Sequence, residues 1–120
     1  MTGVLVCDDA PDMRALLRDA LDADPGLCVV GEAADGAAAL RLAETLQPDV
    51  VLLDIGMPGP GADAVVAGLR EAAPEAAIVV LSGFGPERLD ASAAEAIAAH
   101  LPKTADLAVV RRTVRAAGAA

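Results

Sequence analysis

Five polar side chains follow short runs of branched apolar residues, and their types are those that phosphoryl chemistry needs. Asp8 and Asp9 follow the first run, Asp54 the third, Ser82 the fourth and Lys103 the fifth. Three carboxylates gathered in one place repel one another strongly unless a cation joins them. Hard oxygen ligands with room for water suit Mg²⁺, which also binds phosphate oxygens, and Mn²⁺ could replace it. These carboxylates are therefore candidate metal ligands.

Lys103 is the single lysine of the chain, and the other eight basic residues are arginine. A compact ammonium, unlike a guanidinium, can hold one phosphoryl oxygen in a tight space. Ser82 could donate a hydrogen bond to another oxygen. With Asp54 as nucleophile, the set describes phosphoryl transfer to a carboxylate. Each residue also has a plainer interpretation: Asp8 could cap a helix, Lys103 could be a surface lysine, and Ser82 could belong to a turn.

The apolar runs predict five strands. They lack polar alternation, which is typical of strands buried on both faces of a parallel sheet. We expect strands at Val4–Cys7, Leu27–Val30, Val50–Leu53, Ala77–Leu81 and Ala99–Leu101.

Longer amphipathic segments between the runs predict helices, with proline and glycine at their ends. We expect helices at Pro11–Ala23, Gly36–Leu46, Ala62–Ala72, Glu87–Ala98 and Ala105–Ala117. Five strand–helix repeats predict an α/β fold with a central parallel sheet and right-handed crossovers. Ligands bind such sheets at the carboxyl ends of the strands, so the strand-end groups should share one crevice.

Composition limits the remaining possibilities. A chain of 120 residues predicts a single domain over residues 1–120, and 1% aromatic residues predict a core of Val, Leu, Ile and Ala. The net charge of −9 argues against binding nucleic acid or an anionic membrane surface. Cys7 and Cys28 lie in apolar runs and are expected to be structural, which fits the cytoplasm. No signal peptide is evident, and no apolar run is long enough to cross a bilayer.

The ordered motifs resemble those of response-regulator receiver domains of two-component systems, over essentially the whole chain. The opening of the family is matched by VLVCDDAPDMRALLRDAL, and the segment around its phosphorylated aspartate by PDVVLLDIGMPGPG. Its fourth-strand and fifth-strand regions are matched by VVLSG and HLPK. The NarL/FixJ branch is the most similar, through CVVGEAADGAAAL and the MPG that follows Asp54.

The resemblance implies a flavodoxin-like (βα)5 three-layer sandwich with strand order 2-1-3-4-5. It makes Asp54 the phosphoacceptor in a Mg²⁺-dependent, self-catalysed transfer that is followed by autodephosphorylation. It also implies roles for the neighbouring groups: Asp9, Asp54 and the Gly56 carbonyl as direct metal ligands, Asp8 as a ligand mainly through water, and Ser82 and Lys103 as contacts of the phosphoryl group.

The same resemblance implies a sensor histidine kinase as donor and an output domain, outside this chain, that regulates transcription. A homodimer could form on phosphorylation. Two alternatives stay open. One is a receiver-like interaction module that no longer depends on phosphate. The other is an unrelated α/β enzyme, although a flavin phosphate would meet the two negative charges of Asp8 and Asp9.

Several positions depart from the family pattern, and two of them lie near Lys103. His100 stands where Tyr or Phe is usual, the aromatic side chain whose rotation accompanies activation. Thr104 follows Lys103 where many members have proline, although the NarL/FixJ branch often lacks it. We hypothesise that the His100 ring still turns toward Ser82, with an ease that depends on pH, because imidazole gains a proton in the physiological range. The alternative is a half-exposed residue of an edge strand. Equal coupling to phosphorylation at about pH 5.5 and about pH 8 in an NMR titration would contradict the hypothesis.

Overall fold

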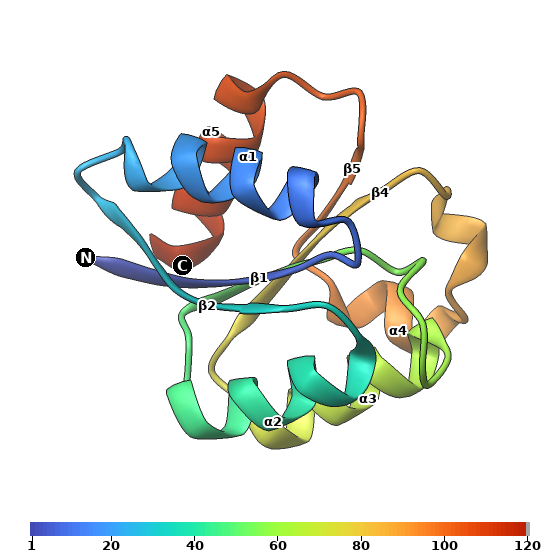
Figure 1. The fold of residues 1–120 in the computed structure, drawn as a ribbon. Helices are drawn as coiled ribbons and strands as arrows, with labels where there is room; N and C mark the ends of the chain where they lie inside the picture. The colour runs from blue at the N-terminus through green and yellow to red at the C-terminus, as the bar shows by residue number, and fades with distance from the viewer. Residues whose placement is uncertain (120) are drawn as a thin grey trace.

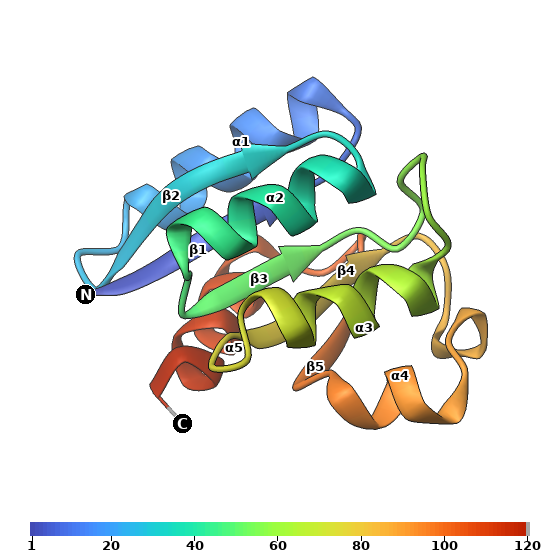
Figure 2. The ribbon, with the colours of Figure 1, turned by 90° about the horizontal axis from the view of Figure 1, so that it is seen from below.

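The computed structural model describes residues 1–119 and contains one five-stranded parallel sheet. The strand order is β2-β1-β3-β4-β5, as the family resemblance implied (Figures 1 and 2). The strands are β1 (Thr2–Cys7), β2 (Leu27–Ala33), β3 (Val50–Leu53), β4 (Ala77–Ser82) and β5 (Ala99–Pro102). The strand that was expected to end at Val30 continues to Ala33, and the others agree within two residues.

Helices cover both faces of this sheet and complete the three layers. Helices α1 and α5 lie on one face, and α2, α3 and α4 lie on the other (Figure 1). Their bounds are α1 (Pro11–Asp22), α2 (Gly36–Leu46), α3 (Ala62–Ala72), α4 (Ala91–Ala96) and α5 (Leu107–Ala119). No helix among residues 1–119 is both long and apolar enough to cross a bilayer.

The central strands are apolar on both faces because each face meets a helix layer. Alternate side chains of a strand point to opposite faces. Accordingly Val4 and Val6 pack with α1 and α5, whereas Leu5 and Cys7 pack with α2 and α3. All four residues of β3 are buried. The core is thus two aliphatic layers divided by the sheet, and the packing of the central strands fixes where they end.

The helix expected at Glu87–Ala98 is wrong. The structure has a 3₁₀ helix, η1 (Pro86–Arg88), followed by the short α4. Leu89 is extended, and Asp90 then caps α4, its side chain accepting a 2.8 Å hydrogen bond from the Ala93 amide. Aspartate gains more as a cap than inside a helix, because its carboxylate satisfies a free backbone donor. After α4 the Ala98 amide bonds the Ile78 carbonyl at 2.7 Å, which turns the chain into β5.

Two adjacent leucines of α1 test the packing of this core. Leu17 is 2% exposed within the layer beneath α1 and α5, whereas Leu16 is 48% exposed. Leu17→Ala should lower the free energy of unfolding by about 2–5 kcal/mol. Leu16→Ala should change it by about 0.5 kcal/mol or less. Urea denaturation measures both. Equal losses at the two positions would contradict the described packing of α1.

The two cysteines test burial at the end of β1. Cys7 is 2% exposed, and Cys28 is only partly buried. Burial, helped by the charge of Asp8, raises the pKa of the Cys7 thiol from 9.0 to about 12. At pH 8 a disulfide reagent should therefore label Cys28 quickly and Cys7 only on unfolding. The unfolded chain loses the Cys7 proton above about pH 9, whereas the folded chain keeps it to higher pH. The free energy of unfolding should therefore fall as the pH rises from 9.0 toward 12.

A Cys28→Ser variant provides the control for the labelling experiment. It should show almost no fast-reacting thiol when folded and one thiol in denaturant. Fast labelling of Cys7 in the folded variant would show that the end of β1 is open to solvent.

Candidate functional site

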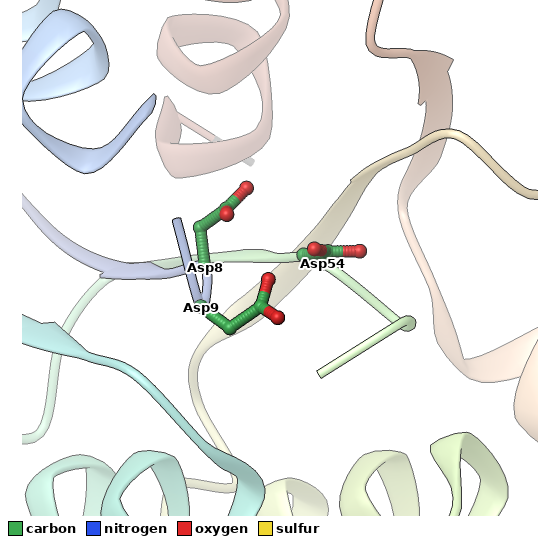
Figure 3. Close-up of side chains that lie close together, drawn as sticks. All are labelled: Asp8, Asp9 and Asp54. Atoms are coloured by element: carbon green, nitrogen blue, oxygen red, sulfur yellow. The ribbon is translucent and has the colours of Figure 1, made fainter. Parts of the chain in front are cut away.

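The pairing of β1 with β3 brings two aspartates together. Cys7 lies opposite Leu53 in the parallel register, so Asp8 and Asp54 are the next residues on adjacent strands. The Asp54 amide donates a 2.9 Å hydrogen bond to the Cys7 carbonyl, which extends the ladder by one residue. Asp9 follows Asp8, and one carboxylate oxygen from each of the three aspartates lies within 4.8 Å of the others (Figure 3). The structure therefore brings together all three carboxylates that the sequence singled out.

The three carboxylates differ in how firmly they are held. Asp8 is 1% exposed, and its Oδ1 accepts a 2.9 Å hydrogen bond from the Ala10 amide. Asp54 is 6% exposed, and its Oδ1 accepts a 2.9 Å hydrogen bond from the Gly56 amide. Asp9 is exposed, and its carboxylate has no hydrogen bond to any of the residues that the structure describes. Two rigid carboxylates thus face a third that is free to adjust.

Lys103 bridges the two buried carboxylates. Its Nζ lies 2.8 Å from Asp8 Oδ2 and 3.0 Å from Asp54 Oδ2. Burial alone lowers the pKa of Lys103, but the hydrogen bonds and charges of Asp8 and Asp54 outweigh it and raise that pKa above its ordinary value. Lys103 therefore remains an ammonium at neutral pH. The sequence predicted its place near Asp54 but not its equal contact with Asp8.

The donor set fits a divalent cation. With all three carboxylates ionised, the one ammonium of Lys103 leaves two negative charges uncompensated. Carboxylate oxygens close together at one edge of the sheet are the ligands that Mg²⁺ and Mn²⁺ accept while keeping several waters. Asp9, which is solvent-exposed, gives the cluster an open side. The residues present thus fit the metal that the sequence predicted.

Ser82 lies at the same edge of the sheet, but its hydroxyl bonds the backbone of the loop that follows it. It is 1% exposed at the end of β4, and its Oγ accepts a 3.1 Å hydrogen bond from the Phe84 amide. Its backbone carbonyl accepts a 3.2 Å hydrogen bond from the Lys103 amide. The Ser82 side chain makes no hydrogen bond to Asp54 or Lys103 in the described part of the chain. Because the hydroxyl is used there as an acceptor, its proton is free to be donated.

Gly56 and Phe84 close one side of the site. A Cβ atom on Gly56 would lie 2.6 Å from Cε2 of Phe84, so the ring occupies the space that a side chain would take. Phe84 is 41% exposed, and Cζ of Arg88 lies 3.9 Å from the centre of its ring. Glycine is therefore required at this position as long as the ring stays there. The stacking with Arg88 was not predicted from the sequence.

His100 is half-buried on the edge strand β5, opposite Val80 of β4. Its Nε2 is the one buried side-chain nitrogen or oxygen without a hydrogen-bond partner among residues 1–119. This burial matches the plainer interpretation of an edge-strand residue, and the pH-dependent rotation stays a prediction. The bond between Lys103 and Thr104 is trans, like every other peptide bond in the described chain.

Arg14 contacts the site and was missed in the sequence. Its Nη1 donates a 2.7 Å hydrogen bond to the backbone carbonyl of Asp8, and its Nε lies 3.4 Å from Glu32 Oε1. The only signal was its position in the first turn of the helix that follows Asp8 and Asp9. Spacing alone did not reveal that a side chain of this helix would reach back to the strand end.

Comparison with known proteins agrees with this geometry. A family model described as the response regulator receiver domain matches residues 4–115. The nitrate/nitrite response regulator protein NarL of Escherichia coli (strain K12) is 39% identical over 79 residues, which cover 66% of this chain and 37% of NarL. This chain thus spans little more than a third of that relative.

Two solved structures extend the likeness to nearly the whole chain. The signal receiver domain of NarL from Mycobacterium tuberculosis superimposes with a TM-score of 0.88 at 32% identity, covering 98% of this chain and 96% of that one. The response regulator domain of Thermotoga maritima CheB gives a TM-score of 0.87 at 25% identity, covering 100% and 98%. The chain belongs to the response-regulator receiver domain family, its fold is the flavodoxin-like receiver fold, and its NarL relatives support the NarL/FixJ branch.

Proposed function

We propose that this domain is a phosphorylation-activated switch that accepts a phosphoryl group on Asp54 in a Mg²⁺-dependent reaction. The proposal rests chiefly on one observation. The Asp54 carboxylate is 6% exposed, lies beside two other carboxylates and is held by the ammonium of Lys103. A buried aspartate needed only for stability would rarely be placed in such a cluster, because like charges oppose one another.

Asp54 supplies the nucleophile. An oxygen of its carboxylate attacks the phosphorus of the donor, a new O–P bond forms, and the bond to the leaving group breaks. With a histidine kinase as donor, the leaving group is the imidazole of a phosphohistidine, which takes up a proton as it departs. The hydrogen bond from the Gly56 amide to Oδ1 and the contact of Lys103 with Oδ2 hold the plane of the carboxylate. A fixed nucleophile lowers the entropic part of the barrier.

Lys103 and Ser82 receive the phosphoryl oxygens. The ammonium of Lys103 already touches Asp54 Oδ2, so it can neutralise charge on a phosphoryl oxygen attached to that carboxylate. The free proton of the buried Ser82 hydroxyl can bond a second oxygen. Neither residue transfers a proton to phosphorus; both stabilise charge.

The acidic cluster would hold the metal through Asp9, Asp54 and the backbone carbonyl of Gly56, with Asp8 acting mainly through water. When bound, Mg²⁺ would supply charge neutralisation for the donor phosphate and orient its oxygens. The same arrangement serves dephosphorylation, in which water attacks the phosphorus, the bond to the Asp54 oxygen breaks, and inorganic phosphate leaves while the carboxylate is restored. Gly56 carries no side chain that could orient or block that water.

The partners follow from the family. We infer a sensor histidine kinase as the phosphoryl donor, a cytoplasmic location and a transcriptional output domain, with a homodimer forming on phosphorylation. The NarL relatives favour this output, whereas a likeness to a protein-glutamate methylesterase/protein-glutamine glutaminase of Myxococcus xanthus leaves an enzymatic output domain as the second candidate. The receiver chemistry at Asp54 is the same in both cases. Neither candidate requires this domain to bind nucleic acid, which its net charge of −9 opposes.

Acetyl phosphate or fluoroberyllate, added with Mg²⁺, tests the proposed chemistry. We expect shifts of backbone amide resonances around Asp54, Ser82 and Lys103 in the NMR spectrum. With acetyl phosphate we also expect a base-labile gain of one phosphoryl group in the mass spectrum. Both effects should vanish on addition of a chelator or with Asp54→Asn, because the nucleophile or its metal is then missing.

Asp19→Asn provides the control, since it removes the same charge from an exposed position of α1. This variant should respond like the original protein. If the original protein gives no response to either reagent, the chain is better explained as a receiver-like interaction module that does not use phosphate.

A further inference from the structure

Asp9 differs from the other two carboxylates of the site in how it is held. Asp8 is fixed by the Ala10 amide and Lys103, and Asp54 by the Gly56 amide and Lys103. The exposed Asp9 carboxylate makes no hydrogen bond within residues 1–119. Its position therefore depends on the backbone that carries it.

Arg14 fixes that backbone. The carbonyl oxygen that accepts its 2.7 Å hydrogen bond belongs to the peptide plane joining Asp8 to Asp9. A peptide unit is planar, so holding its oxygen also sets the orientation of the Asp9 amide and the place of its Cα. Arg14 is itself held at its other end, because its Nε lies 3.4 Å from Glu32 Oε1 on β2. The guanidinium thus links β2, the start of α1 and the Asp8–Asp9 peptide.

We propose that Arg14 is a positioning residue that presets Asp9 for divalent cation binding. The inference rests on the function proposed above and adds a residue that acts through the backbone. Groups that orient metal ligands typically contribute about 10-fold to 100-fold in metal affinity. Within residues 1–119 Arg14 makes no hydrogen bond or ion pair with the three site carboxylates, so its effect would pass through the Asp8 carbonyl.

The charge of Arg14 and its positioning role predict opposite changes in Mg²⁺ affinity when the side chain is removed. As a positive charge near a cation site, Arg14 repels Mg²⁺, so its removal would strengthen binding if charge were its whole effect. As a positioning group, it preorganises a ligand, so its removal weakens binding. The sign of the change in affinity therefore separates the two.

Arg14→Met is the variant of choice because methionine keeps part of the apolar stem and removes the guanidinium. Arg18→Met is the matched control. Arg18 lies one turn further along α1, contacts the same Glu32 at 2.5 Å and has no hydrogen bond to Asp8. Titration of each protein with MgCl₂ alone, followed by calorimetry or amide NMR, gives the dissociation constants without any phosphoryl donor.

We expect Arg14→Met to weaken Mg²⁺ binding by about tenfold and Arg18→Met to leave it unchanged or slightly stronger. Arg14→Lys keeps the charge but loses the planar fork that joins the carbonyl to Glu32, so it should also bind Mg²⁺ more weakly. It serves in place of Arg14→Met if that variant fails to fold, as judged by thermal unfolding. The resonance of the Asp9 amide should shift in both Arg14 variants before metal is added.

Unchanged or tighter Mg²⁺ binding in Arg14→Met would overturn the inference, as would an Arg14→Lys variant equal to the original protein. Equal weakening by Arg18→Met would also overturn it, since the effect would then belong to Glu32 or α1 generally. If the protein without substitutions binds no Mg²⁺, that result would count against the proposed function instead.

Discussion

The repulsion among three carboxylates at one edge of the sheet is the constraint around which this domain is built. Asp8 and Asp54 lie next to each other because β1 pairs with β3, and both are almost fully buried. Burial strengthens every electrostatic interaction, including this repulsion. The protein offsets it with the ammonium of Lys103, supplied by the fifth strand–helix connection. The remaining negative charge would favour the divalent cation of the proposed function.

Several elements far from one another in the sequence serve this one edge. The central strands are apolar on both faces, so they carry polar groups only where they end. The loop after β1 turns back on the Asp8 side chain through the Ala10 amide, and the loop after β3 does the same on Asp54 through Gly56. These hydrogen bonds orient the buried carboxylates. The position of Asp9 depends instead on the Asp8–Asp9 peptide, whose carbonyl accepts a hydrogen bond from Arg14. Two firmly held carboxylates and one adjustable carboxylate thus lie in one site.

Much of this arrangement was readable in the sequence because local patterns determine it. Aliphatic runs predicted the strands, and the parallel order placed Asp8, Asp54, Ser82 and Lys103 at one edge. The helix after β4 was mispredicted because apolar spacing continues through Leu89, while the gain from Asp90 as a cap breaks the helix there. Side-chain contacts between distant parts of the sequence were harder to predict. The contact of Lys103 with the Asp8 carboxylate and the hydrogen bond of Arg14 to the Asp8 carbonyl depend on how side chains pack, which sequence spacing does not encode.

In the proposed function, a signal that passes through Ser82 would first reach the segment that follows it. Ser82 ends a strand that is buried from Ile78 onward, yet between Ser82 and β5 the chain forms only η1 and the six-residue α4. Asp63 of α3 tethers the start of α4 by accepting a 2.9 Å hydrogen bond from the Asp90 amide. So short a helix has little intrinsic stability and depends on its packing and caps. A change in the hydrogen bonding of Ser82 would therefore act on the least regular part of the fold, whereas the neighbouring β3, buried throughout, resists it.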